Sequence, residues 1–392
     1  MADLYLSAPG LVSPFGLGLE ANAEALFTGQ SGLVARNDLL LGRTAWVGAV
    51  TADLPPLPAD FEQQDCRNNR MLRLAMEQIR PQLDEALAAY GAERIAVVLG
   101  SSTAGMDKGE AALAHWQREG ALPADFDYER QALGSVARFA ADYLGIKGPA
   151  YSISTACSSS GKAFASGQRL IKAGLADAVL VGGVDSLCRL TLNGFKALES
   201  VAPGPCTPFG EGRQGISIGE GAAVFLLSKK KGEVRLAGVG ESSDGYHISA
   251  PEPEGKGARL AMDQALAQAG IQYGDIGYVN LHGTGTPKND EMEAGLMARC
   301  FGAATKVSTS KAQVGHALGA AGALEAAFGY LALTDPEGRL PPQLWRGPQD
   351  PALPELNYAA LGDRQPVRYL MSNSYAFGGS NVSVVLANDT RN

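Results

Sequence analysis

Short, uninterrupted apolar segments recur along the chain, and they constrain its fold more than any other feature of the sequence. We expect buried strands at residues 95–99, 151–154, 178–181, 222–227, 278–281, 307–310, 369–372 and 382–386. Helical patterns lie between them, most clearly at residues 160–172, 258–269 and 317–333. Strands that alternate with helices predict α/β layers around a largely parallel sheet, and continuous apolar strands predict burial on both sheet faces.

The 392 residues suffice for two or three domain-sized units. No low-complexity linker divides the chain, and the Pro-rich stretches are short enough to be ordered loops. The best internal boundary lies near residues 232–245, where a strand-rich first half ends. We therefore expect an N-terminal half that spans residues 1–240 and a C-terminal half that spans residues 241–392.

Charge, cysteine content and hydropathy argue against several classes of protein. The formal net charge is −8, which argues against broad nucleic-acid binding. The five cysteines are odd in number and irregularly spaced, so they indicate reduced thiols rather than a disulfide framework or a zinc site. No apolar stretch predicts a transmembrane helix, and the N-terminus does not resemble a signal peptide. We expect a cytoplasmic protein without a membrane span.

Cys157 is the candidate nucleophile. It lies at a turn between a predicted strand and a predicted helix, and Gly174 is the expected end of that helix. Free N–H groups and the helix dipole at such a position favour a thiolate, and small neighbours leave room for a bulky group on the sulfur. The alternative is a buried cysteine that serves as a small apolar residue, and the turn alone leaves the two interpretations equal.

Two of the four histidines, His282 and His316, lie in glycine-rich loops after predicted strands. A neutral imidazole can donate a hydrogen bond to a carbonyl oxygen that becomes negative in a transition state. Lys311 could polarise this network or hold a carboxylate by charge. The alternatives are ordinary loop histidines and a solvated surface lysine. Nothing catalytic surrounds His115 and His247.

Taken together, these segments resemble the elongating β-ketoacyl-acyl-carrier-protein synthases of the thiolase superfamily. Beyond the segments at Cys157, His282 and Lys311/His316, three further motifs match. They are Thr207-Pro208-Phe209, Gly219-Glu220-Gly221-Ala222 and the run from Asn373 to Asn381. The motifs occur in the family's order, and with residues 10–16 the resemblance covers essentially the whole chain.

The resemblance implies an α/β, five-layer αβαβα thiolase-like fold with two similar halves. It implies an acyltransferase, a 3-oxoacyl-acyl-carrier-protein synthase of fatty-acid or polyketide/polyene-type biosynthesis, whose substrates are carried on the phosphopantetheine of an acyl carrier protein. Cys157 would take the acyl group, a malonyl thioester would lose CO2, and the carbanion would attack the acyl-cysteine. The chemistry would need no cofactor. The expected assembly is a homodimer, or a heterodimer with a synthase-like subunit.

The resemblance also assigns roles to the catalytic residues. His282 and His316 would stabilise the developing enolate oxygen, and Lys311 would orient the histidine site. The backbone N–H groups of Cys157 and Phe377 would form the oxyanion hole.

Substrate-binding roles fall on four residues. Thr284 and Thr286 would bond the pantetheine arm, while Phe195 and Phe377 would line and gate the acyl pocket. The resemblance further implies a structural monovalent cation near the active site. Its ligands would be the side chains of Asn280, Glu293 and Glu325 and main-chain oxygens near Ser372 and Asn373. An ordinary buried polar network is an equal alternative for that set.

The sequence departs from the family's pattern around the pocket. Ala376 replaces the usual Gly before the gating Phe, and we expect its Cβ to restrict the movement of that loop. Tyr375 replaces the commoner Phe, Gly210 replaces an Asp, and Ile216 replaces a Phe. These departures concern acyl-chain selectivity and favour a specialised pathway over housekeeping fatty-acid elongation.

Carrier proteins are acidic, so we expect positive charge near the entrance of the site. Arg67, Arg70 and Arg73 form one candidate cluster, and Arg213 lies in a loop that matches the carrier-facing region of the family. A solvated helix face would explain each of these residues equally well.

Other functions remain as alternatives. A degradative thiolase shares the implied fold but uses a second cysteine as base, which the His282 and Lys311/His316 motifs argue against. A non-catalytic, chain-length-determining partner subunit typically lacks the nucleophile that is present here. The sequence argues against a metal hydrolase, because His282 and His316 lack the companion ligands of an HExxH-like motif.

Overall fold

The computed structural model describes residues 3–391. The strands are β1 (Tyr5–Leu6), β2 (Gly10–Ser13), β3 (Gly16–Leu17), β4 (Leu33–Leu40), β5 (Arg43–Gly48), β6 (Ile95–Gly100), β7 (Ala150–Ile153), β8 (Ala178–Asp185), β9 (Gly221–Ser228), β10 (Val234–Ser243), β11 (Ile276–Asn280), β12 (Lys306–Ser308), β13 (Tyr369–Tyr375) and β14 (Ser380–Ala387). The α-helices are α1 (Gly18–Phe27), α2 (Arg67–Gln78), α3 (Arg80–Tyr90), α4 (Met106–Glu119), α5 (Ser135–Leu144), α6 (Ser159–Lys172), α7 (Arg189–Ala197), α8 (Lys256–Ala269), α9 (Pro287–Cys300), α10 (Lys311–Val314) and α11 (Ala321–Thr334).

One strand-pairing pattern occurs twice in the main sheet, whose order is β12-β11-β13-β14-β10-β1-β9-β8-β6-β7. In the first group β6 runs parallel to β7 and β8, and β8 runs antiparallel to β9. In the second group β11 runs parallel to β12 and β13, and β13 runs antiparallel to β14. The antiparallel strands β1 and β10 join the groups. The expectation of a largely parallel sheet was therefore wrong, because each group closes on an antiparallel strand.

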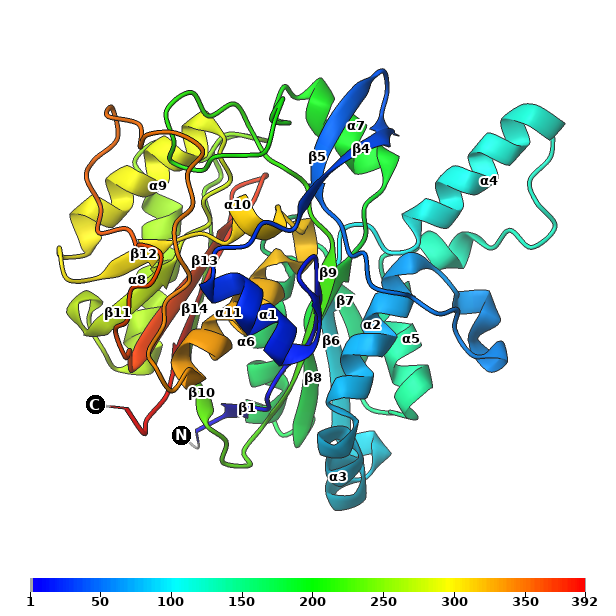
Figure 1. The fold of residues 1–392 in the computed structure, drawn as a ribbon. Helices are drawn as coiled ribbons and strands as arrows, with labels where there is room; N and C mark the ends of the chain where they lie inside the picture. Colours follow the sequence, from blue (N-terminus) through cyan, green and yellow to red (C-terminus); the bar gives the residue numbers. More distant parts are fainter. Residues whose placement is uncertain (1–2, 392) are drawn as a thin grey trace.

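Helices separate and cover the two strand groups in five layers (Figure 1). The helices α2, α3 and α5 pack outside the first group, and α8 and α9 pack outside the second. Between the groups lie α6 and α11, whose side chains share one hydrophobic core with both strand groups. This is the expected αβαβα arrangement, and its apolar strands are buried on both faces as their sequences predict.

The close approach of α6 and α11 brings the two halves of the site together. Each helix follows the edge strand of its group, β7 for α6 and β12 for α11. A Cβ atom at Gly322 would lie 2.8 Å from the Gly161 nitrogen, so the helices can approach this closely only because Gly322 lacks a side chain. Cys157 precedes α6 and His316 precedes α11, and the crossing therefore places both residues in one region.

Several sequence-based boundaries differ from the structure. The strand expected at 307–310 ends at Ser308, and the helix expected at 317–333 starts with a 3-10 turn at Leu318–Ala320 before α11. The left-handed φ of 49° at Leu318 explains why a regular helix cannot include that residue. The division expected near residues 232–245 stays a prediction; this segment is mostly β10, which joins the two strand groups.

Two segments lie outside the layers (Figure 1). The hairpin of β4 and β5 forms a separate two-stranded sheet, and α4 extends away from the body of the molecule. Among residues 3–391, no helix combines the length and apolar character that a membrane crossing requires.

Candidate active site

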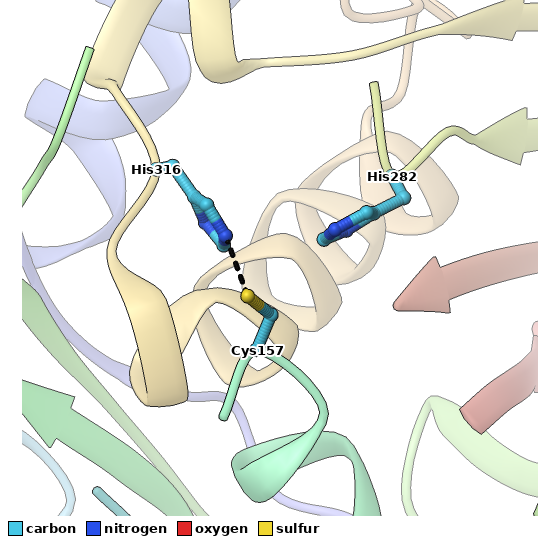
Figure 2. A group of neighbouring side chains, drawn as sticks. All are labelled: Cys157, His282 and His316. Carbon is cyan, nitrogen blue, oxygen red and sulfur yellow. Dashed lines mark hydrogen bonds between the residues drawn. The ribbon is translucent and has the colours of Figure 1, made fainter. Parts of the chain in front are cut away.

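Three reactive side chains from distant parts of the sequence meet at one point. The His316 Nε2 atom lies 2.9 Å from the Cys157 Sγ atom, and the rings of His282 and His316 lie 5.3 Å apart in an edge-to-face arrangement. One ligating atom of each residue lies within 4.8 Å of those of the other two. Figure 2 shows both imidazoles directed at the sulfur. The geometry that the three motifs predicted is thus present, and all three side chains are buried.

A tight turn after β7 aims the nucleophile. Ala156 has a left-handed φ of 52°, which reverses the chain between the strand and α6. The Ser159 hydroxyl donates to the Ala156 carbonyl oxygen at 2.6 Å and accepts from the Thr155 amide at 2.9 Å. Small hydroxyl side chains can make these local bonds, and they hold a strained backbone that presents Cys157 to the histidines.

The expectation of a resting thiolate was wrong. Burial raises the pKa of the Cys157 thiol to about 11, although the charge of Lys311 and the backbone amides of Phe377 and Cys157 act in the opposite direction. The desolvation cost of a buried thiolate exceeds the stabilisation from the helix N-terminus. The thiol is therefore protonated near neutral pH and needs a base when it reacts.

His316 is placed to act as that base. Burial, followed by the charge of Lys311, holds the pKa of His316 well below its ordinary value, so the imidazole is neutral. Its backbone is fixed on both sides, because its amide donates to the Ser217 carbonyl oxygen at 2.7 Å and its carbonyl oxygen accepts from the Gly219 amide at 2.8 Å. This anchoring keeps the Nε2 atom beside the sulfur.

His282 is also neutral, since burial and the charge of Lys311 hold its pKa well below the ordinary value. Two acidic residues of α9 fix its loop. Glu293 accepts the His282 and Gly283 amides at 2.7 Å each, and Asp290 accepts the Gly285 amide at 3.2 Å. Sequence reasoning did not assign Glu293 and Asp290 this task. Their spacing of three residues on a helix just after the loop was the available signal.

Lys311 lies behind the histidines and not in the cavity. Its side chain is 1% exposed, so the interpretation as a solvated surface lysine is wrong. The Nζ atom donates to the His282 carbonyl oxygen at 2.5 Å and pairs with the Glu325 carboxylate. Lys311 thus holds the His282 loop, and its positive charge adds to the effect of burial in keeping both imidazoles neutral.

A turn between β13 and β14 leaves one amide directed toward the sulfur. The Gly379 amide donates to the Ala376 carbonyl oxygen at 2.9 Å, and Gly378 has a φ of 86°. Only glycine adopts this φ freely in the second central position of a turn, and the amide of the first central residue, Phe377, stays available. It opposes the rise of the pKa of Cys157, as does the Cys157 amide.

A cavity of about 390 Å³ leads to the three reactive groups. Each substrate-binding residue that the resemblance implied lines it, namely Phe195, Thr284, Thr286 and Phe377. The Thr284 and Thr286 hydroxyl oxygens are 2.9 Å apart, and the rings of Phe195 and Phe377 are 5.5 Å apart. Ile216, Tyr375 and Ala376 also line the cavity, so three of the four departures from the family pattern lie at the pocket.

The residues expected to hold a monovalent cation are buried near this cavity but already bond to protein groups. Glu293 accepts two amides, and Glu325 pairs with Lys311 through one oxygen. The Asn280 amide donates to the Ser372 hydroxyl at 3.3 Å, and Asn373 accepts from the Ser383 hydroxyl. Within the described residues, the Glu325 Oε2 atom is buried without a hydrogen-bond partner. Cys157, His282 and His316 could themselves hold a soft metal ion.

The arginines expected to meet a carrier protein are largely committed elsewhere. Arg213 is 8% exposed and interacts with Asp290, Glu291 and Asp350. It cannot serve as a free docking residue, so that prediction is corrected. The sequence places Arg213 in a loop and therefore predicted an exposed side chain, but ion pairs with three carboxylates hold its guanidinium in the interior.

Two of the three arginines on α2 also pair with carboxylates of this chain. Arg67 bonds to the buried carboxylate of Glu220, and Arg70 pairs with Asp65. The Nε atom of Arg73 is buried without a partner in the part of the chain that the structure describes. None of the three belongs to the described lining of the cavity.

Comparisons with known proteins agree with this site. A family model described as the β-ketoacyl synthase N-terminal domain matches residues 10–232, and one described as the C-terminal domain matches residues 234–345. Nodulation protein E of Rhizobium meliloti is 38% identical over 251 residues, and the match covers 61% of this chain and 61% of that protein. The chain thus spans about three fifths of that relative's length.

Two further relatives are more fully covered. The 3-oxoacyl-acyl-carrier-protein synthase 2 of Staphylococcus aureus is 32% identical over 312 residues, which cover 75% of this chain and 77% of that protein. Among solved structures, a chain from the complex of a ketosynthase with its chain length factor from Xenorhabdus doucetiae is 46% identical. That likeness has a TM-score of 0.93 and covers 99% of this chain and 98% of the other.

Proposed function

Because this chain belongs to the β-ketoacyl synthase family, we propose that it catalyses the decarboxylative condensation of an acyl thioester with a malonyl thioester. The observation that carries the proposal is the distance of 2.9 Å between the His316 Nε2 atom and the Cys157 Sγ atom, with His282 facing the same point. The product is a 3-ketoacyl thioester, and both substrates are carried on the phosphopantetheine of an acyl carrier protein.

The first half-reaction transfers the acyl group to Cys157. The sulfur attacks the thioester carbonyl carbon while its proton passes to the His316 Nε2 atom. The carbonyl oxygen becomes an oxyanion, which the amides of Cys157 and Phe377 stabilise by hydrogen bonds. The carbon–sulfur bond to the carrier arm then breaks, and the leaving thiolate takes the proton back from His316. The acyl-cysteine and the free carrier thiol balance the step.

The second half-reaction forms the carbon–carbon bond. The carboxylate of the malonyl thioester leaves as CO2, and the electron pair moves into an enolate. Neutral His282 and His316 donate hydrogen bonds from their rings to the enolate oxygen, and for His316 this step requires the tautomer that carries its single ring proton on Nε2. The enolate carbon attacks the acyl-cysteine carbonyl, and the Cys157 thiolate leaves and takes up one proton from solvent, which the overall reaction consumes.

The test is the mass of the product on the carrier protein. With a panel of acyl-carrier primers and malonyl-carrier, the wild-type protein should yield a 3-ketoacyl-carrier and one CO2 per product. Cys157→Ala should abolish condensation, and His316→Ala should block decarboxylation. Normal condensation by either variant would refute the assigned roles.

The alternative functions are less well supported. A thiolase needs a second cysteine at the reacting thioester, and Cys157 is the single cysteine in the described lining of the cavity. A non-catalytic partner subunit has no need for a nucleophile that contacts a histidine. Release of one CO2 per product would exclude a thiolase. Acylation of Cys157 by a labelled thioester would exclude a non-catalytic subunit.

We also propose an acyl carrier protein as partner and an assembly of two synthase-like chains, either identical or not. The solved relative from Xenorhabdus doucetiae, which forms a complex with a chain length factor, supports the second form. We also propose the division near residue 240, which lies within β10, because the same pairing pattern occurs in the strands before and after β10. A cytoplasmic location agrees with five unpaired cysteines.

We further propose that a monovalent cation stabilises the C-terminal half. The buried Glu325 Oε2 atom, unpartnered within residues 3–391, supports this site, because oxygen ligands suit a hard cation. The other oxygens would come from the side chains of Asn280 and Glu293 and from the main chain near Ser372 and Asn373. Potassium should raise the thermal midpoint relative to tetramethylammonium at equal ionic strength, and Glu325→Gln should remove that difference.

A further inference from the structure

One short segment lines the cavity from its floor to its mouth. His282, Thr284, Thr286 and Lys288 alternate along the chain, and all four line the cavity. Their exposure increases in that order. His282 is 1% exposed, Thr284 is 6% exposed, Thr286 is half-buried and Lys288 is exposed. The segment therefore presents an imidazole beside the nucleophile, two hydroxyls above it and an ammonium group at the surface.

Lys288 is the positively charged side chain in the described lining of the cavity. The other charged side chains in its described lining, apart from the neutral histidines, are the carboxylates of Glu199 and Asp244. Asp244 already accepts the Asn381 side-chain amide at 2.7 Å and the Glu252 backbone amide at 3.1 Å. A negatively charged ligand at the mouth thus has one attractive side chain on the cavity wall, and that attraction fixes where the charge will lie.

We propose that Lys288 binds the phosphate group of the phosphopantetheine arm. This inference rests on the proposed function, because it assumes that the arm delivers the thioester to Cys157. The arm carries a thioester at one end, amides in the middle and a phosphate at the other end. That order matches Cys157 and His282, then Thr284 and Thr286, then Lys288. Lysine recognises phosphate as a compact charge with three donors.

The test compares two ligands that differ only in the phosphate, namely phosphopantetheine and pantetheine. Calorimetric titration of the wild-type protein should show tighter binding of phosphopantetheine. Lys288→Ala should weaken phosphopantetheine binding roughly 10-fold and leave pantetheine binding unchanged. Lys288→Arg should retain most of the affinity, because it keeps the charge. Lys256→Ala is the matched control, since Lys256 is 78% exposed on α8 and outside the described lining of the cavity.

Two results would overturn the proposal. One is equal affinity of the wild-type protein for both ligands, and the other is an equal loss for both ligands in Lys288→Ala. The binding measurement does not depend on turnover. A protein that binds phosphopantetheine through Lys288 but never forms an acyl-cysteine would refute the proposed function and leave this inference standing.

Discussion

The reactivity of the site depends on burial at the level of single residues. Water is removed from Cys157, His282 and His316, so the thiol keeps its proton and both imidazoles stay neutral. Uncharged groups cost less to bury than ions, and proton transfer between sulfur and Nε2 then needs no solvent. The nearby ammonium of Lys311 is tolerated because a carboxylate pairs with it.

The first prediction concerns the protonation of the nucleophile. Alkylation of Cys157 by iodoacetamide should accelerate steadily as the pH rises from 6.5 through 9.0, because the pKa of the thiol lies at about 11. Peptide mass spectrometry can follow this cysteine separately from the other four. A rate that stops rising near neutral pH would show a resting thiolate and contradict the assignment.

The second prediction concerns the buried pair of Lys311 and Glu325. Lys311→Met should lower the free energy of unfolding by about 3 kcal/mol, because it leaves a buried carboxylate without its cation. The double variant Lys311→Met/Glu325→Gln should recover most of that loss in urea unfolding. A double variant no more stable than the single one would show that the pair is not coupled.

The pH dependence of this destabilisation follows from the ionisation of Glu325. Burial raises the pKa of Glu325 above its ordinary 4.5, and removal of Lys311 raises it further. The folded variant then holds a proton that the unfolded chain releases. The destabilisation by Lys311→Met should consequently be smallest in acid and should increase as the pH rises above the raised wild-type pKa of Glu325, where this carboxyl ionises in the wild type and stays protonated in the variant.

At this scale, sequence reasoning predicted that three reactive side chains meet in one site, and the structure brings them together. Cys157, His282 and His316 were predicted because reactive residue types occur beside small residues. Arg213 and the protonation of the thiol were predicted wrongly for one reason, since both depend on how deeply a group is buried by segments distant in sequence.

At the scale of elements, turns rather than helices position the groups that contact the substrate. The turn at residues 376–379 presents the Phe377 amide, and the turn before α6 presents Cys157. Each depends on a left-handed φ, at Gly378 and at Ala156 respectively. Because apolar patterns are local, the sequence predicted eight of the 14 strands within the described residues, but it singled out three of the 11 α-helices. It did not predict the 3-10 turn after His316, whose strained Leu318 is held by tertiary packing.

The third prediction uses the Phe377 turn. Gly378→Ala should slow acylation of Cys157 roughly 100-fold, because a Cβ disfavours the φ of 86° and displaces the Phe377 amide. The matched control is Gly120→Ala, which has a φ of 73° at the end of α4. In both glycines a Cβ would meet open space, so strain is the common effect.

Both variants should lose about 1 kcal/mol of unfolding free energy, and only Gly378→Ala should lose acylation. Single-turnover labelling by an acyl thioester, read by intact mass, measures the difference. Equal acylation rates in the two variants would show that the Phe377 amide contributes nothing to the reaction.

At the scale of the whole molecule, two similar strand groups bring together residues that are about 160 positions apart (Figure 1). No obvious sequence repeat marks the two halves, and yet their pairing patterns agree. The glycine contact between α6 and α11 fixes their separation. Sequence patterns do not encode this repeat, because many apolar residues suit the same buried strand.

The fourth prediction concerns a buried connection between distant segments. Arg213 links α9 with the loop at Asp350, so Arg213→Gln should lower the free energy of unfolding by about 3 kcal/mol. Its activity should fall equally with carrier-bound and small thioesters. The exposed Arg118→Gln serves as the control and should leave stability unchanged. A loss confined to carrier-bound substrates would restore Arg213 as a docking residue.

The most direct test of the account follows a single acyl group through the site. The protein is loaded with a labelled acyl thioester, the acyl-enzyme is isolated, and malonyl-carrier is added. The account predicts that one acyl group leaves Cys157 for each 3-ketoacyl-carrier formed and each CO2 released. Product that forms without label on Cys157, or label that leaves without release of CO2, would contradict it.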